Sequence, residues 1–445
     1  MRKRTSPPRW IVSPVVLAIA LGTAATTAAQ VYPTDKRHLT GPLEICDQGS
    51  FFVGGVPKVT QYANSVTPSA YQELIIGQMY VQFQVPQGAR KWPLVMVHGG
   101  GYSGSCLEST PDGNEGWFSY SVRHKLATYV VDQAGRGRSG WDRSFVNERI
   151  ATGSLAGFPN LGNTSSSGIW TAWFGFIIPA GSDIITGRMI QRGDPGDPTC
   201  ASDPFHCART AQMIPPVPNT VDPSIEARVG AIGPTPNPLN DTYLALQHYK
   251  YGVPNTDVTL PSSTCAYCVP TTINGADTWS GRDLATLVEG LHGAVVATHS
   301  QSGSVGHHMV RYLKEDDAAG KCGGPGACLA MLQGLITIDG VCSFANTGLT
   351  AADFAHIPYL VVRGWYPSGI SNGCNGTVAA IKAAGGTADF IKLDDPSFGT
   401  QFQGVTHMMM MSTKSLEVFD VILNWASKNI DNPPAHGACG PEGKD

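Results

Sequence analysis

One short stretch constrains the fold of this chain more than any other: an apolar strand that runs into a serine and then into a helix. Ala294-Val-Val-Ala297 is followed by Thr298-His-Ser-Gln-Ser302, and apolar residues then recur every four positions from Val305. A nucleophilic serine needs a sharp strand-to-helix turn with small residues two positions to either side. Those neighbours are here a threonine and a serine. We expect Ser300 to be a nucleophile, although a turn that merely contains a serine is the alternative.

Other short apolar runs predict a mostly parallel sheet flanked by helices. Leu94-Val-Met-Val97 and Tyr129-Val-Val131 are apolar throughout, as in strands buried on both faces, and a helical segment over 115–126 separates them. Met79-Tyr-Val-Gln-Phe-Gln-Val85 alternates, which is typical of a half-exposed antiparallel strand. Strand, helix and strand in succession indicate an α/β domain. Further strands are expected at 294–297, 335–338, 359–362 and 390–393, and further helices at 283–291 and 416–425.

Two segments depart from this pattern. Residues 143–261 are dense in Gly, Pro, Ser and Asn, and we interpret them as a large insertion that caps the active site. Residues 1–29 are basic, then apolar, then small, which is typical of a secretory signal peptide and leaves a domain over 30–445. The apolar run is too short to span a membrane. We therefore expect a secreted or periplasmic protein with no stable membrane insertion.

The charge balance argues against one class of partner. The chain has 30 Lys and Arg against 34 Asp and Glu, a formal net charge of −4. Removal of the signal peptide takes away four basic residues and no acidic one, which makes the charge −8. A mildly acidic protein is not expected to bind nucleic acid. A homodimer is compatible with these observations.

The chain contains eleven cysteines, which in an exported protein indicate disulfides more than metal sites. Three pairs lie close in sequence: Cys200 with Cys207, Cys265 with Cys268, and Cys322 with Cys328. Cys265 and Cys268 could instead be half a zinc site or a redox pair, but no second ligand pair stands at a suitable spacing. We expect local disulfides, one cysteine left over, and no metal.

A glycine-rich loop follows the predicted strand that ends at Val97. It reads His98-Gly-Gly-Gly101, and glycine allows the main chain to approach a substrate closely. In an α/β-hydrolase fold this loop supplies one N–H group of the oxyanion hole, and the residue after the nucleophile supplies the other. We therefore expect the oxyanion hole at the N–H groups of Gly100 and Gln301, with His98 as a structural histidine.

The general base is expected at His407. Gly404-Val-Thr-His407 lies between the last predicted strand and the last predicted helix, where a histidine can reach across the strand ends to the serine. His299, His307 and His308 lie near the serine in sequence, and we interpret them as packing and helix residues.

The acid that orients this histidine is harder to place. The loop after the strand at 359–362, where the fold most often keeps it, contains no carboxylate. Asp339 stands at the end of the preceding strand, on the same edge of the sheet, and could accept a hydrogen bond from His407. Asp394 and Asp395 are the alternatives.

Several motifs together resemble a known group, the secreted bacterial carboxylesterases of the α/β-hydrolase superfamily whose nucleophile turn reads His-Ser-Gln-Ser-Gly. In that family the acid is a glutamate after the sixth strand, which by position corresponds to Asp339. The matching segments are His299-Ser-Gln-Ser-Gly303, Glu108-Ser-Thr-Pro-Asp-Gly113 with Gly116-Trp117, Val131-Asp-Gln-Ala-Gly-Arg-Gly-Arg-Ser139, and His407-Met-Met-Met410.

These observations predict a serine carboxylic-ester hydrolase that works through an acyl-enzyme, without a cofactor, on a small-molecule or polymeric ester. Aromatic residues, among them Tyr102, Trp117 and the segment 170–176, could line an apolar pocket or form a core of their own. Two alternatives remain. The same residues could cleave amides or act as a lyase, or the chain could be a catalytically silent secreted binding protein.

Overall fold

The computed structural model describes residues 38–110, 113–154, 173, 176–177, 190–191, 251–253, 277–366 and 368–433. The expected signal peptide, most of the expected cap insertion, and the cysteines at 200, 207, 265, 268 and 439 lie outside these residues. Within the insertion, a short strand pair is described, β5 (Phe176–Ile177) and β6 (Ile190–Gln191).

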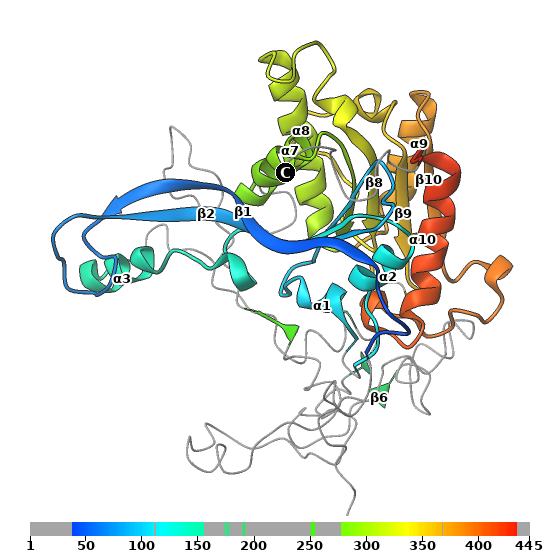
Figure 1. Ribbon diagram of the computed structural model, residues 1–445, viewed down its shortest axis with the longest axis horizontal. Helices are drawn as coiled ribbons and strands as arrows, with labels where there is room; N and C mark the ends of the chain where they lie inside the picture. The colour runs from blue at the N-terminus through cyan, green and yellow to red at the C-terminus, as the bar shows by residue number, and fades with distance from the viewer. Residues whose placement is uncertain are drawn as a thin grey trace, which may run out of the picture.

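One eight-stranded sheet forms the centre of the molecule (Figure 1). Its strands are β1 (Ile45–Thr60), β2 (Gln72–Pro86), β3 (Leu94–Val97), β4 (Thr128–Asp132), β7 (Ala294–His299), β8 (Leu332–Ile338), β9 (Tyr359–Arg363) and β10 (Ala388–Lys392). Their order across the sheet is β1-β2-β4-β3-β7-β8-β9-β10. β1 and β4 pair with β2 antiparallel, and the strands from β4 to β10 are parallel. The carboxyl ends of the parallel strands therefore share one edge.

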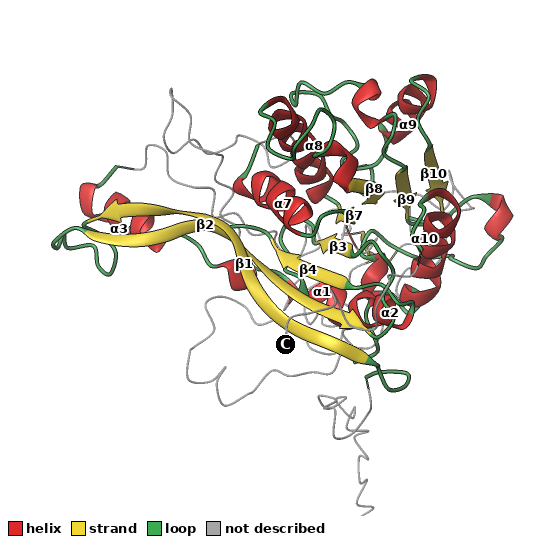
Figure 2. Cartoon of the chain, turned by 45° about the horizontal axis from the view of Figure 1, so that its top comes forward, coloured by secondary structure: helices red, strands yellow, loops and turns green. Residues whose placement is uncertain are grey.

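Helices cover both faces of the sheet (Figure 2). They are α1 (Ser105–Glu108), α2 (Trp117–Arg123), α3 (Arg143–Thr152), α7 (Trp279–Gly290), α8 (Ser302–Ala318), α9 (Cys374–Ala383) and α10 (Ser415–Asn429). Successive residues of a strand point to opposite faces. Met96 accordingly packs in the core beneath α2 and α10, whereas Val95 packs in the core beneath α7, α8 and α9. A strand that is apolar throughout is needed to fill two such cores.

A two-stranded arm extends beyond the rest of the sheet. β1 pairs with β2 from Ile45 to Thr60, but β4 covers only the part of β2 from Tyr80 to Gln84. Figure 1 shows the arm projecting to the left with α3 beneath it. α3 is held there by an ion pair between Lys58 and Asp142. The first turns of the expected insertion therefore pack on this arm.

The predicted elements of the sheet core are confirmed, with shifts at their ends. β3 has the predicted bounds, whereas the predicted helix at 115–126 is shorter and the helix predicted at 283–291 begins at Trp279. The strand predicted at 390–393 starts two residues too late and ends one residue too late, since β10 runs from Ala388 to Lys392. β1 was not predicted, and the alternating segment at 79–85 is the inner part of the much longer β2.

The local disulfide predicted between Cys322 and Cys328 is present. A second disulfide joins Cys342 to Cys374, which are 32 residues apart and were not predicted as a pair. Cys46 is also disulfide-bonded, and Cys106 is a buried free thiol.

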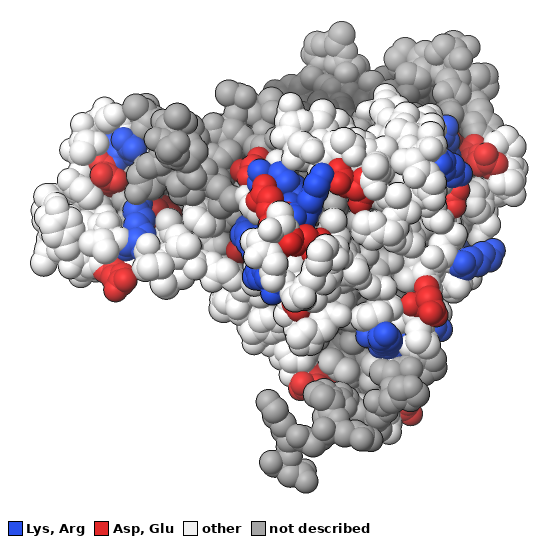
Figure 3. Space-filling model, turned by 90° about the horizontal axis from the view of Figure 1, so that it is seen from above, with Lys and Arg blue, Asp and Glu red and all other residues white. Residues whose placement is uncertain are grey.

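The surface of the described residues mixes both charges. Seen from above, basic and acidic side chains lie next to one another, with wide areas between them that carry neither (Figure 3). Among the helices of the described ranges, none has the length and apolar character to cross a membrane.

Candidate active site

Ser300 occupies the sharp turn between β7, which ends at His299, and α8, which begins at Ser302. Its φ of +58° lies in the left-handed region, which a non-glycine residue rarely adopts. Main-chain hydrogen bonds hold the turn in this conformation: the Ser300 N–H donates to Ile338 O at 3.0 Å, and its carbonyl accepts from Val341 N at 3.0 Å. The serine thus has the strained strand-to-helix geometry of a nucleophile turn, although only 4% of the residue is exposed.

The turn is tightly packed by glycines on neighbouring segments. A Cβ added to Gly99 would lie 2.8 Å from the Ser300 Cβ, and one added to Gly303 would lie 2.2 Å from Val341 O. Ser302 is more than a small residue, because its hydroxyl accepts from His299 N at 2.8 Å and lies 3.1 Å from Val97 O. The closest backbone approach therefore falls at Gly303, one residue beyond the position that the sequence pattern indicated.

His407 and Asp339 are brought together although 68 residues separate them. The His407 Nδ1 lies 2.7 Å from the Asp339 Oδ2, and both side chains are essentially inaccessible to solvent. Because a carboxylate can only accept, Nδ1 carries the proton and Nε2 is the basic nitrogen. The buried Nε2 makes no hydrogen bond within the described structure, Ser300 included. In an unliganded site such a contact often forms only once substrate binds.

Asp339 is held ionised by its neighbours. Burial alone would raise its pKa, but hydrogen bonds from His407 and Ser371, together with the charge of His407, bring the pKa below its ordinary value. The two alternative acids are engaged elsewhere: Asp394 pairs with Arg363, and Asp395 accepts from Ser397 N at 2.9 Å.

A buried polar network fixes the expected oxyanion loop. The His98 Nδ1 lies 2.8 Å from Gly99 O, while its Nε2 accepts from Gln133 N at 3.0 Å. Burial lowers the pKa of His98 to about 4, so this histidine is neutral and structural. The Gln301 side chain accepts from Gln133 Nε2 at 3.2 Å and from Arg136 Nη1 at 3.0 Å.

The two residues expected to form the oxyanion hole are neighbours. A Cβ added to Gly100 would lie 3.4 Å from the Gln301 Cβ, and Gln301 stands at the N-cap position of α8 without a side-chain capping hydrogen bond. The positive end of the helix dipole and the free N–H groups of a helix N-terminus favour a developing negative charge. Hydrogen bonds from Gln133 and Arg136 fix the Gln301 side chain, so this side of the expected oxyanion hole is held in place.

Three described residues of the expected insertion lie near the site. The Trp173 ring centroid is 5.3 Å from that of Tyr102 and 6.1 Å from that of His407. Val253 N donates to Gly101 O at 3.0 Å, and Gly252 forms a β-bridge with Tyr102. Trp117, by contrast, stacks on Phe419 with centroids 4.8 Å apart and belongs to the core beneath α10.

Some residues of the site were missed by the sequence analysis. Ser371 contacts Asp339 from a loop 32 residues away, and no local pattern marks it. Gln133 and Arg136 lie inside the segment 131–139, which was noted for its resemblance but given no role. Arg136 could have been noticed from the sequence, because it is a charged residue between two glycines shortly after a buried strand. His299, expected to be a packing residue, has its ring centroid 4.6 Å from that of His407, and its Nε2 lies 3.1 Å from His407 O.

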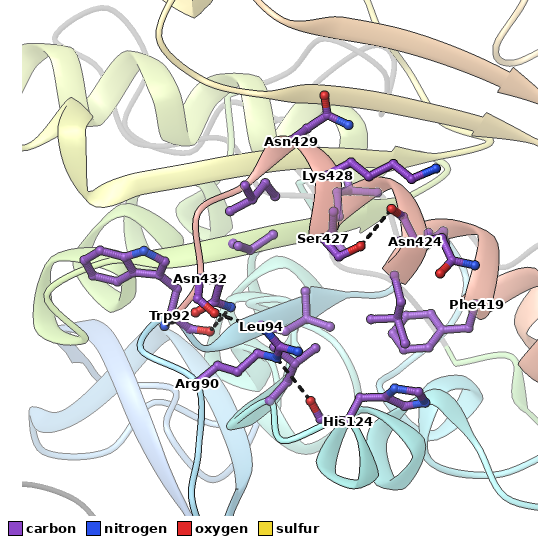
Figure 4. A pocket seen from close by; sticks show the side chains of 18 of the residues that line it. Arg90, Trp92, Leu94, His124, Phe419, Asn424, Ser427, Lys428, Asn429 and Asn432 are labelled. Carbon is purple, nitrogen blue, oxygen red and sulfur yellow. Dashed lines mark hydrogen bonds between the residues drawn. The ribbon is translucent and has the colours of Figure 1, made fainter. Parts of the chain in front are cut away.

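A separate cavity of about 660 Å³ lies away from these residues (Figure 4). Leu94 and Val295 form part of its wall at the beginnings of β3 and β7, and the last two turns of α10 form another part. Arg90 reaches the carbonyls of His124 and Asn432 at its edge. Ser300, Asp339 and His407 do not line it, so it is not part of the candidate active site.

Comparison with known proteins gives relatives of two kinds. No protein-family model matches the sequence. A probable secreted lipase, phiG, from Fungal sp. (strain ATCC 74256) is 30% identical over 138 residues, which are 29% of this chain and 32% of the lipase. The match thus spans about a third of the length of that relative.

Solved structures are similar over most of the chain. A bacterial esterase determined at atomic resolution is 25% identical, covers 87% of this chain and 98% of its own, and has a TM-score of 0.59. Carboxylesterase CesB from Bacillus subtilis covers 86% of this chain at 10% identity and a TM-score of 0.31. With its strand order and flanking helices, the chain has the α/β-hydrolase fold.

Proposed function

We propose that this protein is a secreted serine hydrolase that cleaves carboxylic esters through an acyl-enzyme on Ser300. The observation that carries the proposal is the buried His407–Asp339 hydrogen bond at the same sheet edge as a serine with positive φ. The order Ser300, Asp339, His407 along the chain is the one this fold uses. The similarity to an esterase and to a probable lipase supports an ester as substrate.

The proposed reaction has two halves. His407 Nε2 takes the Ser300 proton as Oγ attacks the ester carbonyl, and the N–H groups of Gly100 and Gln301 stabilise the oxyanion. When the tetrahedral intermediate collapses, the C–O bond to the alcohol breaks and the alcohol takes the proton from Nε2. Water then repeats the sequence on the acyl-enzyme and releases the acid. Asp339 stabilises the imidazolium that forms in both halves.

Export is part of the proposal. Two disulfides in the described ranges, Cys322–Cys328 and Cys342–Cys374, are typical of an oxidising compartment. The fungal relative carries the word secreted in its name. We infer that residues 1–29 are a signal peptide and that 143–261 is a cap whose Trp173 covers His407.

Labelling with a fluorophosphonate tests the serine directly. The wild-type protein should gain the mass of one phosphonate and hydrolyse short p-nitrophenyl esters, whereas Ser300→Ala should do neither. Ser427→Ala, which changes an exposed serine on α10, should behave like the wild type. Hydrolysis of the matching p-nitroanilides would favour an amidase. A folded wild-type protein that is not labelled would contradict the nucleophile and favour a binding protein.

A further inference from the structure

The loop after β9 contributes a hydroxyl group where related enzymes of this fold most often have a carboxylate. Residues 363–372 contain no Asp or Glu. Ser371 on this loop donates its hydroxyl proton to the Asp339 Oδ1 at 2.7 Å, and both residues are fully buried. The two carboxylate oxygens of Asp339 are thereby divided, with Oδ2 facing His407 and Oδ1 facing Ser371.

Asp339 needs such support because it is fully buried, which by itself would raise its pKa. Its backbone is strained as well. Its φ is +37°, an unfavourable value for a residue with a side chain. Within the described residues, His407 is the ionisable group that acts most strongly on Asp339, and His299 also interacts with it. Among the described residues, the largest influences that lower its pKa come from His407 and two serines. Hydroxyl donors, Ser371 and then Ser368, also favour the ionised form of the buried carboxyl group.

The Ser371 hydroxyl is directed at Asp339 and not at the neighbouring helix. It stands three residues before α9, whose N-cap residue is Gly373. The disulfide between Cys342 and Cys374 also joins the two loops, because each cysteine follows Asp339 or Ser371 by three residues. The donor and the acceptor are therefore held on segments that are covalently linked.

We propose that Ser371 is a positioning residue of the active site, whose hydroxyl keeps the Asp339 carboxylate ionised and aimed at His407 Nδ1. The proposal rests on the proposed function, because it requires His407 to act as the base. Ser371 touches no substrate in this role, so it should influence the chemical step and its pH dependence but not substrate binding.

The test compares Ser371→Ala, which removes the donor, with Ser371→Thr, which keeps it. For Ser371→Ala we expect kcat to fall about tenfold with KM changed less than about twofold, since a hydrogen bond to a charged group is lost. The acid limb of the kcat/KM profile should move up by about half a pH unit or more, because an Asp339 carboxylate that has lost one donor interacts more strongly with the protonated form of His407. Ser371→Thr should keep the wild-type limb and stay within about threefold of the wild-type kcat.

Melting temperatures separate this role from a purely structural one. A Ser371→Ala variant with the wild-type kcat and acid limb would overturn the proposal. So would a Ser371→Thr variant that melts with the wild type but has lost as much activity as Ser371→Ala, and this second variant serves if Ser371→Ala does not fold. The absence of esterase activity and fluorophosphonate labelling in the wild type would contradict the proposed function instead.

Discussion

At the scale of single residues, the candidate site depends on positions where no side chain fits. Gly99 lies against Ser300, and a Cβ there would also be 2.8 Å from the His299 Nδ1. Gly99→Ala must displace either the oxyanion loop or the serine turn. An ångström of misplacement can cost about 100-fold in rate, and we expect a loss of at least this size in kcat/KM.

Gly290→Ala is the matched control for that change. Gly290 ends α7 and has open space around its Cα, so alanine should leave the ester hydrolysis rate unchanged. Equal activity in the two variants would show that the close approach at Gly99 has no catalytic consequence.

The acid can be tested by a change that keeps its shape. Asp339→Asn retains the size of the side chain but presents an amide to His407 Nδ1, which favours the wrong tautomer. We expect kcat for p-nitrophenyl ester hydrolysis to fall by about 10⁴-fold, as for the same change in serine proteases. Asp395→Asn, at an exposed position, should remain within about twofold of the wild type. If Asp395→Asn lost more activity than Asp339→Asn, the acid of the site would instead lie at the end of the last strand.

The residues of the site divide into those that the sequence could indicate and those that it could not. Ser300, Asp339 and His407 each follow a strand or precede a helix that the apolar pattern predicts, so the topology alone puts them on one edge. Ser371 lies in a loop with no distinctive pattern, and its contact with Asp339 depends on how that loop folds. A hydrogen bond between two loops leaves no periodic signal in a single chain.

At the scale of elements, burial decides which strands could be predicted. β3 is buried throughout and was predicted to the residue. β1 is an edge strand whose side chains are mostly exposed, so its sequence follows no apolar pattern. Gly54 and Gly55, both with positive φ, interrupt it further. An exposed strand is specified by its pairing with β2, which a local pattern does not show.

The two disulfides offer a comparison between elements. Cys342–Cys374 joins the loops that carry Asp339 and Ser371, whereas Cys322–Cys328 closes a short turn between α8 and β8. We expect the double variant Cys342→Ser/Cys374→Ser to have a kcat about tenfold below that of the wild type, even at temperatures where the variant is folded. Without the disulfide, the Ser371 donor and the Asp339 acceptor separate. The measurement is kcat for p-nitrophenyl ester hydrolysis at a temperature where circular dichroism shows both double variants folded.

Cys322→Ser/Cys328→Ser should affect stability alone. The two cysteines are six residues apart in sequence. A disulfide that closes such a short loop restricts the unfolded chain only slightly, so it adds little to the free energy of unfolding. A larger kcat loss in this variant than in the other would show that the covalent link beside Asp339 has no special role.

At the scale of the whole molecule, one buried carboxylate lies where the arm of β1 and β2 contacts helix α7. Asp283 on α7 lies beside Gly54 of β1, is 2% exposed, and its Oδ2 makes no hydrogen bond within the described residues. Burial raises the pKa of Asp283 to about 8, and the charge of Arg282 offsets only part of this. The folded protein therefore holds a proton that the unfolded chain releases near pH 4.

The sign of the resulting pH dependence follows from linkage. Between about pH 4 and pH 8 the folded state binds more protons than the unfolded state, so the free energy of unfolding falls as pH rises through this window. The loss is complete above pH 8, where Asp283 must ionise in a buried position that the charge of Arg282 stabilises only in part. Asp283→Asn removes this titration, because asparagine is neutral at every pH in the window.

Urea unfolding at pH 5 and pH 9 measures the effect. Relative to the wild type, Asp283→Asn should be more stable at pH 9 than at pH 5 by a few kcal/mol, given about 1.4 kcal/mol per unit of pKa shift. Asp395→Asn, on the surface, should show a far smaller difference between the two pH values. If the stability difference between Asp283→Asn and the wild type is the same at both pH values, Asp283 is solvated or paired in solution. The junction of β1 with α7 would then have to be looser than the buried contact with Gly54 implies.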